Sequence, residues 1–161
     1  ALLQFVFHAF AKNGLFLAAG AVIFYTGHTR VHELRGVGKE LPCTMWAFAL
    51  CSFSLIGIPP TGGFVSKFYL AQGGLELGFV GVFGVAVLML SALLTAGYLL
   101  PVITSAFFPG EDFDYGSVKK SEGSLAMKLP MLLLAAAVLI FGAFPGVLEA
   151  LIAPVTAALF S

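Results

Sequence analysis

The sequence contains uncharged apolar segments that are long enough to cross a lipid bilayer. Residues 77–108 include no Asp, Glu, Lys or Arg, whereas a spanning helix needs only about 20 apolar residues. Hydrophobic residues make up 60% of the 161 residues and charged residues only 10%, compared with about 25% charged residues in an average soluble protein. Too little polar surface is left to cover a water-soluble globule, so the sequence predicts an all-α integral membrane protein.

Hydropathy divides the sequence into a single transmembrane domain, residues 1–161, with four candidate spans. The second span is interrupted at 58–63, where prolines remove backbone donors and clash with the preceding turn, so the helix must break. The residues that predict this break are Pro59, Pro60, Gly62 and Gly63. The expected spans cover about residues 2–25, 43–71, 77–108 and 127–144, followed by a short C-terminal helix at 146–160. We therefore expect a polytopic transmembrane helical bundle with one discontinuous helix.

Basic residues outside the spans gather in two linkers. These linkers, residues 27–42 and 108–128, hold Arg30, Arg35, Lys39, Lys119, Lys120 and Lys128. The short connection between the second and third spans holds no Lys or Arg. With four spans both basic linkers lie on one membrane face, which the positive-inside rule places in the cytoplasm. The prediction is a bacterial or archaeal cytoplasmic membrane protein with loops 27–42 and 108–128 in the cytoplasm.

The sequence begins at Ala1 inside an apolar run. It has no initiator Met, no basic n-region and no small-residue cleavage site, so a signal peptide does not fit. We expect it to be a piece of a longer protein.

Lys12 lies inside the first span, where a charge costs about 2.5–3.5 kcal/mol at the bilayer centre. Gln4, His8 and Lys12 are spaced i, i+4 and i+8, so they share one face of the helix. Because histidine titrates near neutral pH, this polar stripe favours a hydrophilic lining that relays protons. Two alternatives stay open: a hydrogen-bonded seam between helices, and a Lys12 side chain that snorkels to the membrane surface.

Lys67 lies just after the Pro-Pro-Thr-Gly-Gly interruption, within about one turn of the expected start of the second half-helix. In a membrane such a break is tolerated only where it is buried in protein or lines a water-filled cavity. The positive end of the half-helix dipole and desolvation both disfavour the ammonium form. The pattern predicts a lysine that exchanges its proton. The alternative is a plain loop between two short helices, with Lys67 at the membrane interface.

No pattern for a cofactor or a metal ion occurs. Cys43 and Cys51 belong to no CxxC motif or Cys/His cluster, and no phosphate-binding or dinucleotide-binding glycine motif is present. We therefore expect no metal ion, no cofactor and no redox chemistry on this chain. A formal net charge of zero argues against a nucleic-acid partner.

Two segments resemble the antiporter-like membrane subunits of respiratory complex I, Mrp-type cation/proton antiporters and energy-converting hydrogenases. Residues 8–20, HAFAKNGLFLAAG, resemble the family's HAxxKxxLFLxxG signature. Residues 54–68, SLIGIPPTGGFVSKF, are similar to its S-L-x-G-x-P-P-x-x-G-F-x-x-K/E-F pattern. The resemblance covers about residues 4–75; beyond them only the hydropathy and the FGAFP sequence at 141–145 match.

The resemblance implies the C-terminal part of a fold of about fourteen spanning helices, arranged as two inverted repeats. It implies that Lys67 is the proton-channel lysine of the second broken helix, and that His8 and Lys12 line the central hydrophilic axis. The glutamate and lysine of the first repeat have no counterpart here. A half-channel would therefore need helices from another chain or from the rest of the same one.

Three functions remain open at this point. The first is a proton-translocating subunit, or a fragment of one, in a complex I-like NADH:quinone oxidoreductase or an energy-converting hydrogenase. Its partners would be the lipid bilayer and the other membrane subunits, which would supply the redox energy. The second is an Mrp-type Na+/H+ antiporter subunit, with sodium as the counter-ion. The third is a non-conducting structural membrane subunit.

Overall fold

The computed structural model describes residues 2–110, 113–114 and 123–160, and in these residues the chain forms helices and no strands. The predicted all-α class is thereby confirmed. Lys119 and Lys120 lie outside the described residues. The helices are α1 Leu2–Thr26, η1 Val31–Leu34, α2 Val37–Glu40, α3 Pro42–Ile56, α4 Gly62–Leu75, α5 Phe79–Phe107, α6 Leu125–Ala143 and α7 Pro145–Phe160.

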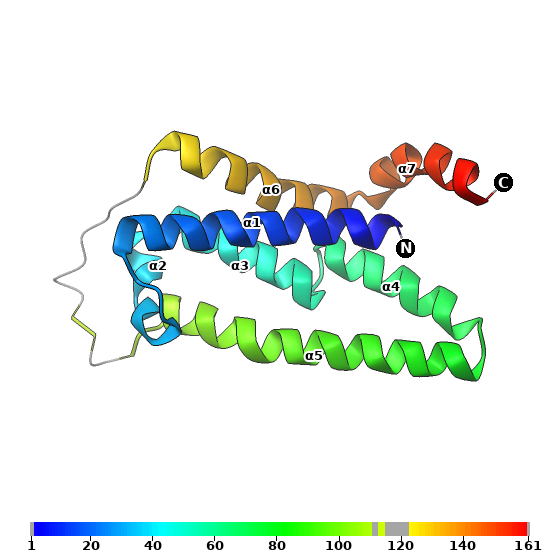
Figure 1. Cartoon of the computed structure of the whole chain (residues 1–161), viewed down its shortest axis with the longest axis horizontal. Coiled ribbons are helices and arrows are strands. Elements are labelled where there is room, and N and C mark those ends of the chain that lie inside the picture. Colours follow the sequence, from blue (N-terminus) through cyan, green and yellow to red (C-terminus); the bar gives the residue numbers. More distant parts are fainter. Residues whose placement is uncertain (1, 111–112, 115–122, 161) are drawn as a thin grey trace.

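The long helices run side by side along one axis (Figure 1). α3 and α4 follow one another along this axis, whereas α1, α5 and α6 are each continuous. The ends of α1 and α5 and the starts of α3 and α6 lie at one end of the molecule. The N-terminus, the turn between α4 and α5, and α7 lie at the opposite end.

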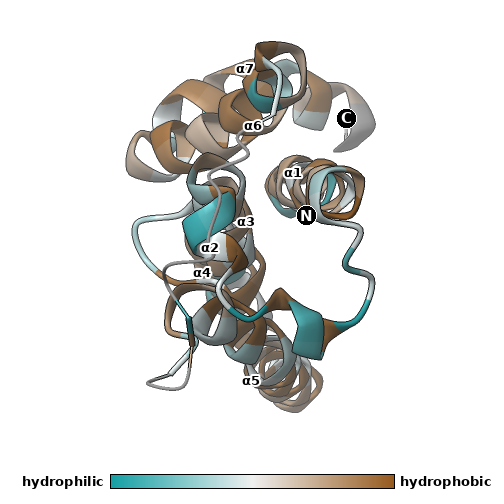
Figure 2. Cartoon of the chain, turned by 90° about the vertical axis from the view of Figure 1, so that its left-hand side faces the viewer, coloured by the Kyte–Doolittle hydropathy of each residue, from teal (hydrophilic) through white to brown (hydrophobic). Residues whose placement is uncertain are grey.

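Three of the described helices are long and apolar enough to cross a membrane by themselves. They are α1 with 25 residues, α5 with 29 and α6 with 19. α3 and α4 have only 15 and 14 residues, so neither reaches the usual minimum of about 17 residues. The long helices consist mostly of hydrophobic residues (Figure 2), and many of these are exposed; on α5, for example, Phe79 is 88% exposed and Leu93 is 69% exposed. Such an exterior is suited to contact with lipid or with other apolar helices, as in an integral membrane protein.

Small residues let α1 approach α3 and α6 closely. The cluster at this contact consists of Ala18, Ala47, Cys51, Met131 and Ala135. A Cβ placed on Gly14 would lie within 3.6 Å of Leu134 in α6 and would also meet the Cys51 side chain in α3. Without a hydrophobic driving force between helices in lipid, close packing of this kind is the main source of helix association.

Hydrogen bonds connect the two linkers at the end of the molecule where α1 and α5 end. The guanidinium of Arg35 donates hydrogen bonds from Nε (3.2 Å) and from a terminal nitrogen to the carbonyl of Pro109. The backbone N–H of Gly36 donates to the carbonyl of Ser105 at 3.2 Å. These contacts join the segment after α1 to the end of α5.

Several backbone groups at the break between α3 and α4 form hydrogen bonds. The N–H groups of Gly57 and Ile58 both donate to the Phe53 carbonyl at 2.9 Å, and Gly57 adopts a left-handed φ of 93° that suits a helix end. Thr61 Oγ1 donates to the Ile58 carbonyl at 2.7 Å, and the N–H of Gly63 donates to Ser54 Oγ at 3.1 Å. Side chains thus replace the missing helical hydrogen bonds, as a low-dielectric environment requires.

We predict that Gly63→Ala destabilises the protein. A Cβ at this position would collide with the backbone carbonyl of Ser54, which cannot move aside as a flexible side chain would. Overpacking of this kind costs about 1–3 kcal/mol. The unfolding temperature of the detergent-purified full-length protein should therefore fall.

Gly84→Ala in α5 is the matched control, because its Cβ would meet nothing within 4 Å. Its unfolding temperature should stay equal or rise slightly, since alanine favours a helix over glycine. Equal unfolding temperatures for Gly63→Ala and the wild type would contradict the close contact between α3 and the start of α4.

Candidate functional site

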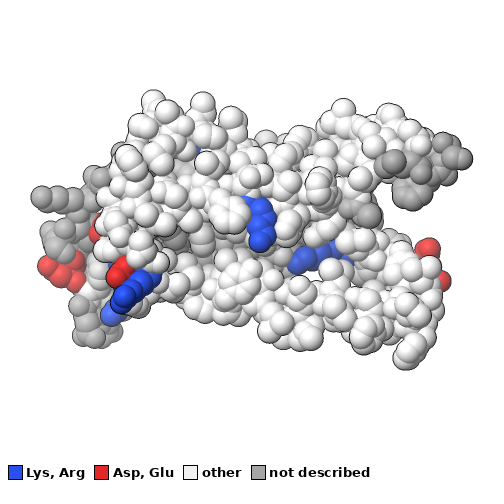
Figure 3. Space-filling view, in the orientation of Figure 1, with Lys and Arg blue, Asp and Glu red and all other residues white. Residues whose placement is uncertain are grey.

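A polar cavity of about 210 Å³ lies between α1, the break and α5. α1 and α4 contribute its amide and its titratable side chains, and α5 contributes three hydroxyls. The polar side chains that line it are Gln4, His8, Lys12, Lys67, Ser91, Thr95 and Tyr98. Basic atoms lie at two places midway along the face drawn in Figure 3, with uncharged residues around them. The structure therefore brings His8, Lys12 and Lys67, which the sequence singled out, to one cavity.

The polar stripe of α1 faces this cavity, and a neighbouring face of the same helix packs in the core. Phe7 and Ala11 are each 1% exposed, whereas their neighbours His8 and Lys12 are exposed in the chain alone. The charges of both Lys12 and Lys67 act on His8. The positive charges of Lys12 and Lys67 therefore repel a positive charge on His8.

Lys67 reaches back from α4 to the end of α3. Its Nζ donates hydrogen bonds to the carbonyls of Leu55 at 2.6 Å and Ile56 at 2.8 Å. These are the last two residues of α3, whose carbonyls have no partner further along the helix. Gly57 makes room for the lysine stem, since a Cβ there would lie 3.0 Å from Lys67 Cδ.

These contacts correct one part of the expected electrostatics of Lys67, the effect of the helix dipole. The sequence suggested that the ammonium lies near the positive end of the second half-helix, which would disfavour it. The structure places the ammonium directly on the negative, carbonyl end of α3, and a cation there is stabilised. The lysine is thus held by the groups that the break sets free.

The break is covered by protein on one side only. Thr61, Gly62 and Gly63 are buried, whereas Pro59 and Pro60 are exposed in the chain alone. A Cβ on Gly62 would overlap the Phe7 ring of α1, and a Cβ on Gly142 of α6 would run into the backbone of residues 60–62. Glycines at these positions therefore let α1 and α6 close over the break.

The three hydroxyls of α5 were missed by the sequence reasoning. Ser91, Thr95 and Tyr98 are spaced i, i+4 and i+7, so they lie on one face of the helix. This spacing could have revealed them. It was overlooked because the segment is uncharged and strongly apolar. Thr95 Oγ1 donates to the Ser91 carbonyl at 2.8 Å, which leaves its oxygen lone pairs able to accept a hydrogen bond.

Comparison with known proteins identifies one family, and the similar proteins agree with it. The NADH:quinone oxidoreductase/Mrp antiporter transmembrane family matches residues 1–109. NADH-quinone oxidoreductase subunit N of Desulforudis audaxviator is 50% identical over 110 residues, which cover 68% of this chain and 22% of that protein. F(420)H(2) dehydrogenase subunit N of Methanosarcina mazei is 33% identical over 86% of this chain and 29% of its own length.

An antiporter subunit is also similar. Na(+)/H(+) antiporter subunit A1 of Staphylococcus haemolyticus is 30% identical over 99% of this chain and 21% of its own length. The chain thus spans between 21% and 29% of the lengths of these three relatives. The family predicted from the two motifs is confirmed: this chain belongs to the NADH:quinone oxidoreductase/Mrp antiporter family of transmembrane proteins.

Proposed function

We propose that this chain is part of a proton-translocating membrane subunit of a redox-driven complex similar to NADH:quinone oxidoreductase. The observation that carries the proposal is the shared cavity of His8, Lys12 and Lys67 beside a broken helix. The 50% identical relative is named a subunit N of NADH-quinone oxidoreductase, and a second is a subunit N of F(420)H(2) dehydrogenase. Ionisable residues within transmembrane segments commonly mark proton relays.

Lys67 is the group that holds and releases the proton. Its ammonium donates to the carbonyls of Leu55 and Ile56, and a further positive charge in the cavity would favour release of its proton. A proton that arrives at Lys12 or His8 supplies such a charge, because like charges in one cavity favour the neutral form of their neighbour. His8 and Lys12 thereby act as the relay that delivers protons to the cavity. The α5 hydroxyls bind water there.

The membrane arrangement follows from the same proposal. α3 and α4 together form one span, which gives four spans with α1, α5 and α6, and the linkers after α1 and α5 face the cytoplasm of a bacterial or archaeal cell. Other membrane subunits, or the rest of the same subunit, cover the exposed side of His8 and Lys12. Partner subunits supply the energy for translocation, since the sequence holds no pattern for a redox cofactor.

An Mrp-type Na+/H+ antiporter subunit is the second candidate, and the 30% identity to an antiporter subunit over 99% of this chain favours it.

The two candidates differ in the ion that is exchanged. In membrane vesicles, replacement of Na+ by choline should leave redox-driven proton uptake unchanged under the first proposal. Loss of proton movement without Na+ would favour the antiporter. A structural subunit without transport would tolerate the loss of both lysines.

We predict that Lys67→Ala lowers the rate of proton translocation by about tenfold or more, since loss of a positioned proton-transfer group typically costs a larger factor still. The measurement is acidification of inside-out vesicles that contain the complete complex with the variant subunit. Lys39→Ala is the matched control, because Lys39 is exposed in the linker and lines no part of the cavity. Full proton translocation in Lys67→Ala would exclude the proposed role.

We also predict that His8→Leu and Lys12→Met each slow proton translocation, and that the double variant is no slower than the worse single variant. Groups that act in one relay are not additive. Asn13→Ala serves as the control on the same helix, because the Asn13 amide donates to the Ala9 carbonyl at 3.0 Å and lies outside the cavity lining. Independent, multiplicative effects of the two single variants would argue against a shared relay.

A further inference from the structure

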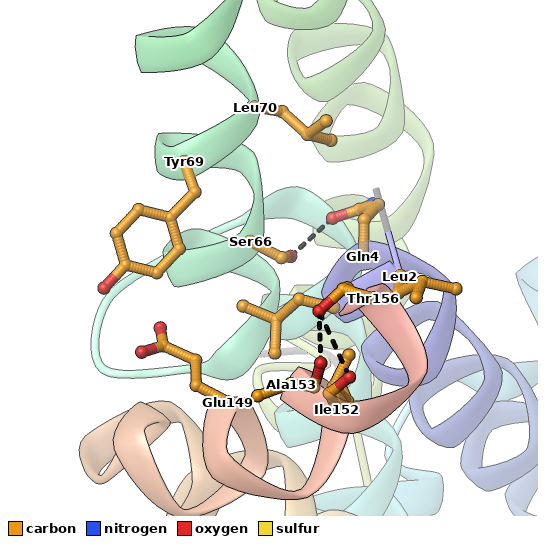
Figure 4. Close-up of a pocket in the computed structure, with 10 residues that line it drawn as sticks. Leu2, Gln4, Ser66, Tyr69, Leu70, Glu149, Ile152, Ala153 and Thr156 are labelled. Atoms are coloured by element: carbon orange, nitrogen blue, oxygen red, sulfur yellow. Dashed lines mark hydrogen bonds between the residues drawn. The ribbon is translucent and has the colours of Figure 1, made fainter. Parts of the chain in front are cut away.

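A second cavity, of about 340 Å³, is open on one side and is lined by residues of α1, α4 and α7 (Figure 4). The N-terminal turn of α1, the helix α4 and the helix α7 lie towards the end of the molecule away from the basic linkers (Figure 1). Gln4, Ser66, Tyr69, Glu149 and Thr156 are its polar lining residues. This cavity is distinct from the one that Lys67 lines. Glu149 has no part in the function proposed above.

Glu149 is the one acidic side chain in this second cavity. It is also the one charged residue of α7, whose other residues are uncharged. Its carboxylate and the hydroxyl of Tyr69 on α4 point toward one another across the cavity and interact (Figure 4). Glu149 is exposed in the chain alone, and an ionisable residue on an apolar membrane helix is by default a candidate for an ion or proton path.

Gln4 lines both cavities. Ser66, which precedes Lys67 in the sequence and is 1% exposed, donates a hydrogen bond from Oγ to Gln4 Oε1 at 2.5 Å (Figure 4). The Gly63 carbonyl is a second acceptor for the same hydroxyl, at 3.2 Å. Because a hydroxyl has one hydrogen to donate, Ser66 can donate to only one of these two acceptors at a time.

We propose that Glu149 exchanges protons between the Lys67 cavity and the membrane side opposite the basic linkers, and that the Gln4–Ser66 hydrogen bond closes the passage between the two cavities. This inference rests on the proposed function of Lys67. When the bond opens, water joins the cavities and the Lys67 ammonium gives up one proton, which leaves a neutral amine. The Glu149 carboxylate takes up that proton, becomes a carboxylic acid, and then releases the proton to bulk water. No electron moves in this step.

The first test uses Glu149→Gln in the full-length subunit, within its complex in proteoliposomes. Proton translocation should fall by about tenfold or more, and Glu149→Asp should restore most of it because a carboxylate is kept. Glu76→Gln is the matched control, since Glu76 ends α4 at the same end of the molecule and lines neither cavity. Tyr69→Phe removes only the hydroxyl; should Glu149→Gln not assemble, slowed translocation in Tyr69→Phe supports the proposal and a wild-type rate overturns it.

The same assay separates this inference from the proposed function. Loss of translocation in Lys67→Ala together with a wild-type rate in Glu149→Gln would overturn the exchange role alone. Wild-type rates in both variants would overturn the function of Lys67 and the exchange role with it.

The second test measures passive proton leak in proteoliposomes that receive no electron donor, under a potassium diffusion potential. Ser66→Ala removes the bond that closes the passage, so the leak should rise above that of the wild type. Ser105→Ala is the control, because Ser105 lies near the far end of α5 and lines neither cavity. An unchanged leak in Ser66→Ala would overturn the role of the Gln4–Ser66 bond.

Discussion

The structure depends on how the backbone groups freed at the break between α3 and α4 are satisfied. In a bilayer an unsatisfied carbonyl or amide costs several kcal/mol, so a broken helix needs partners for the groups that the break exposes. The lysine ammonium takes the last two carbonyls of α3, and the hydroxyl of Ser54 takes the amide of Gly63. One side chain therefore stabilises the break and, in the proposed function, carries the proton. A loss of that proton weakens the contacts at the break, so protonation and local structure are coupled.

The cavity around Lys67 is lined by residues of α1, α3, α4 and α5, yet its α1 side is open. His8 and Lys12 are exposed in the chain alone, and a lysine midway along a membrane helix is too costly to leave in contact with lipid. In the proposed function, further protein covers this side, and the polar stripe of α1 is one wall of a larger hydrophilic passage. The chain spans between 21% and 29% of the lengths of its relatives.

The sequence predicted the helical class, the family and the place of the break, because these depend on local properties: apolar length, proline chemistry and two short motifs. It also placed Gln4, His8 and Lys12 on one face, since helical spacing alone decides that. It did not predict the partners of Lys67. They depend on the path of a long side chain over Gly57 back to α3, which only the folded chain defines. The α5 hydroxyls were passed over for a related reason. They become informative only when packing brings them to the same cavity as residues from distant segments.

The central claim is that Lys67 lies in a hydrated cavity inside the membrane and binds its proton there. The most direct measurement is a high-resolution electron cryomicroscopy map of the complete subunit in its native complex, in a lipid nanodisc. The account predicts Lys67 Nζ on the carbonyls of Leu55 and Ile56, with ordered water between Lys67 and Lys12. A dry cavity, with both lysine side chains extended to the headgroup layer, would contradict it.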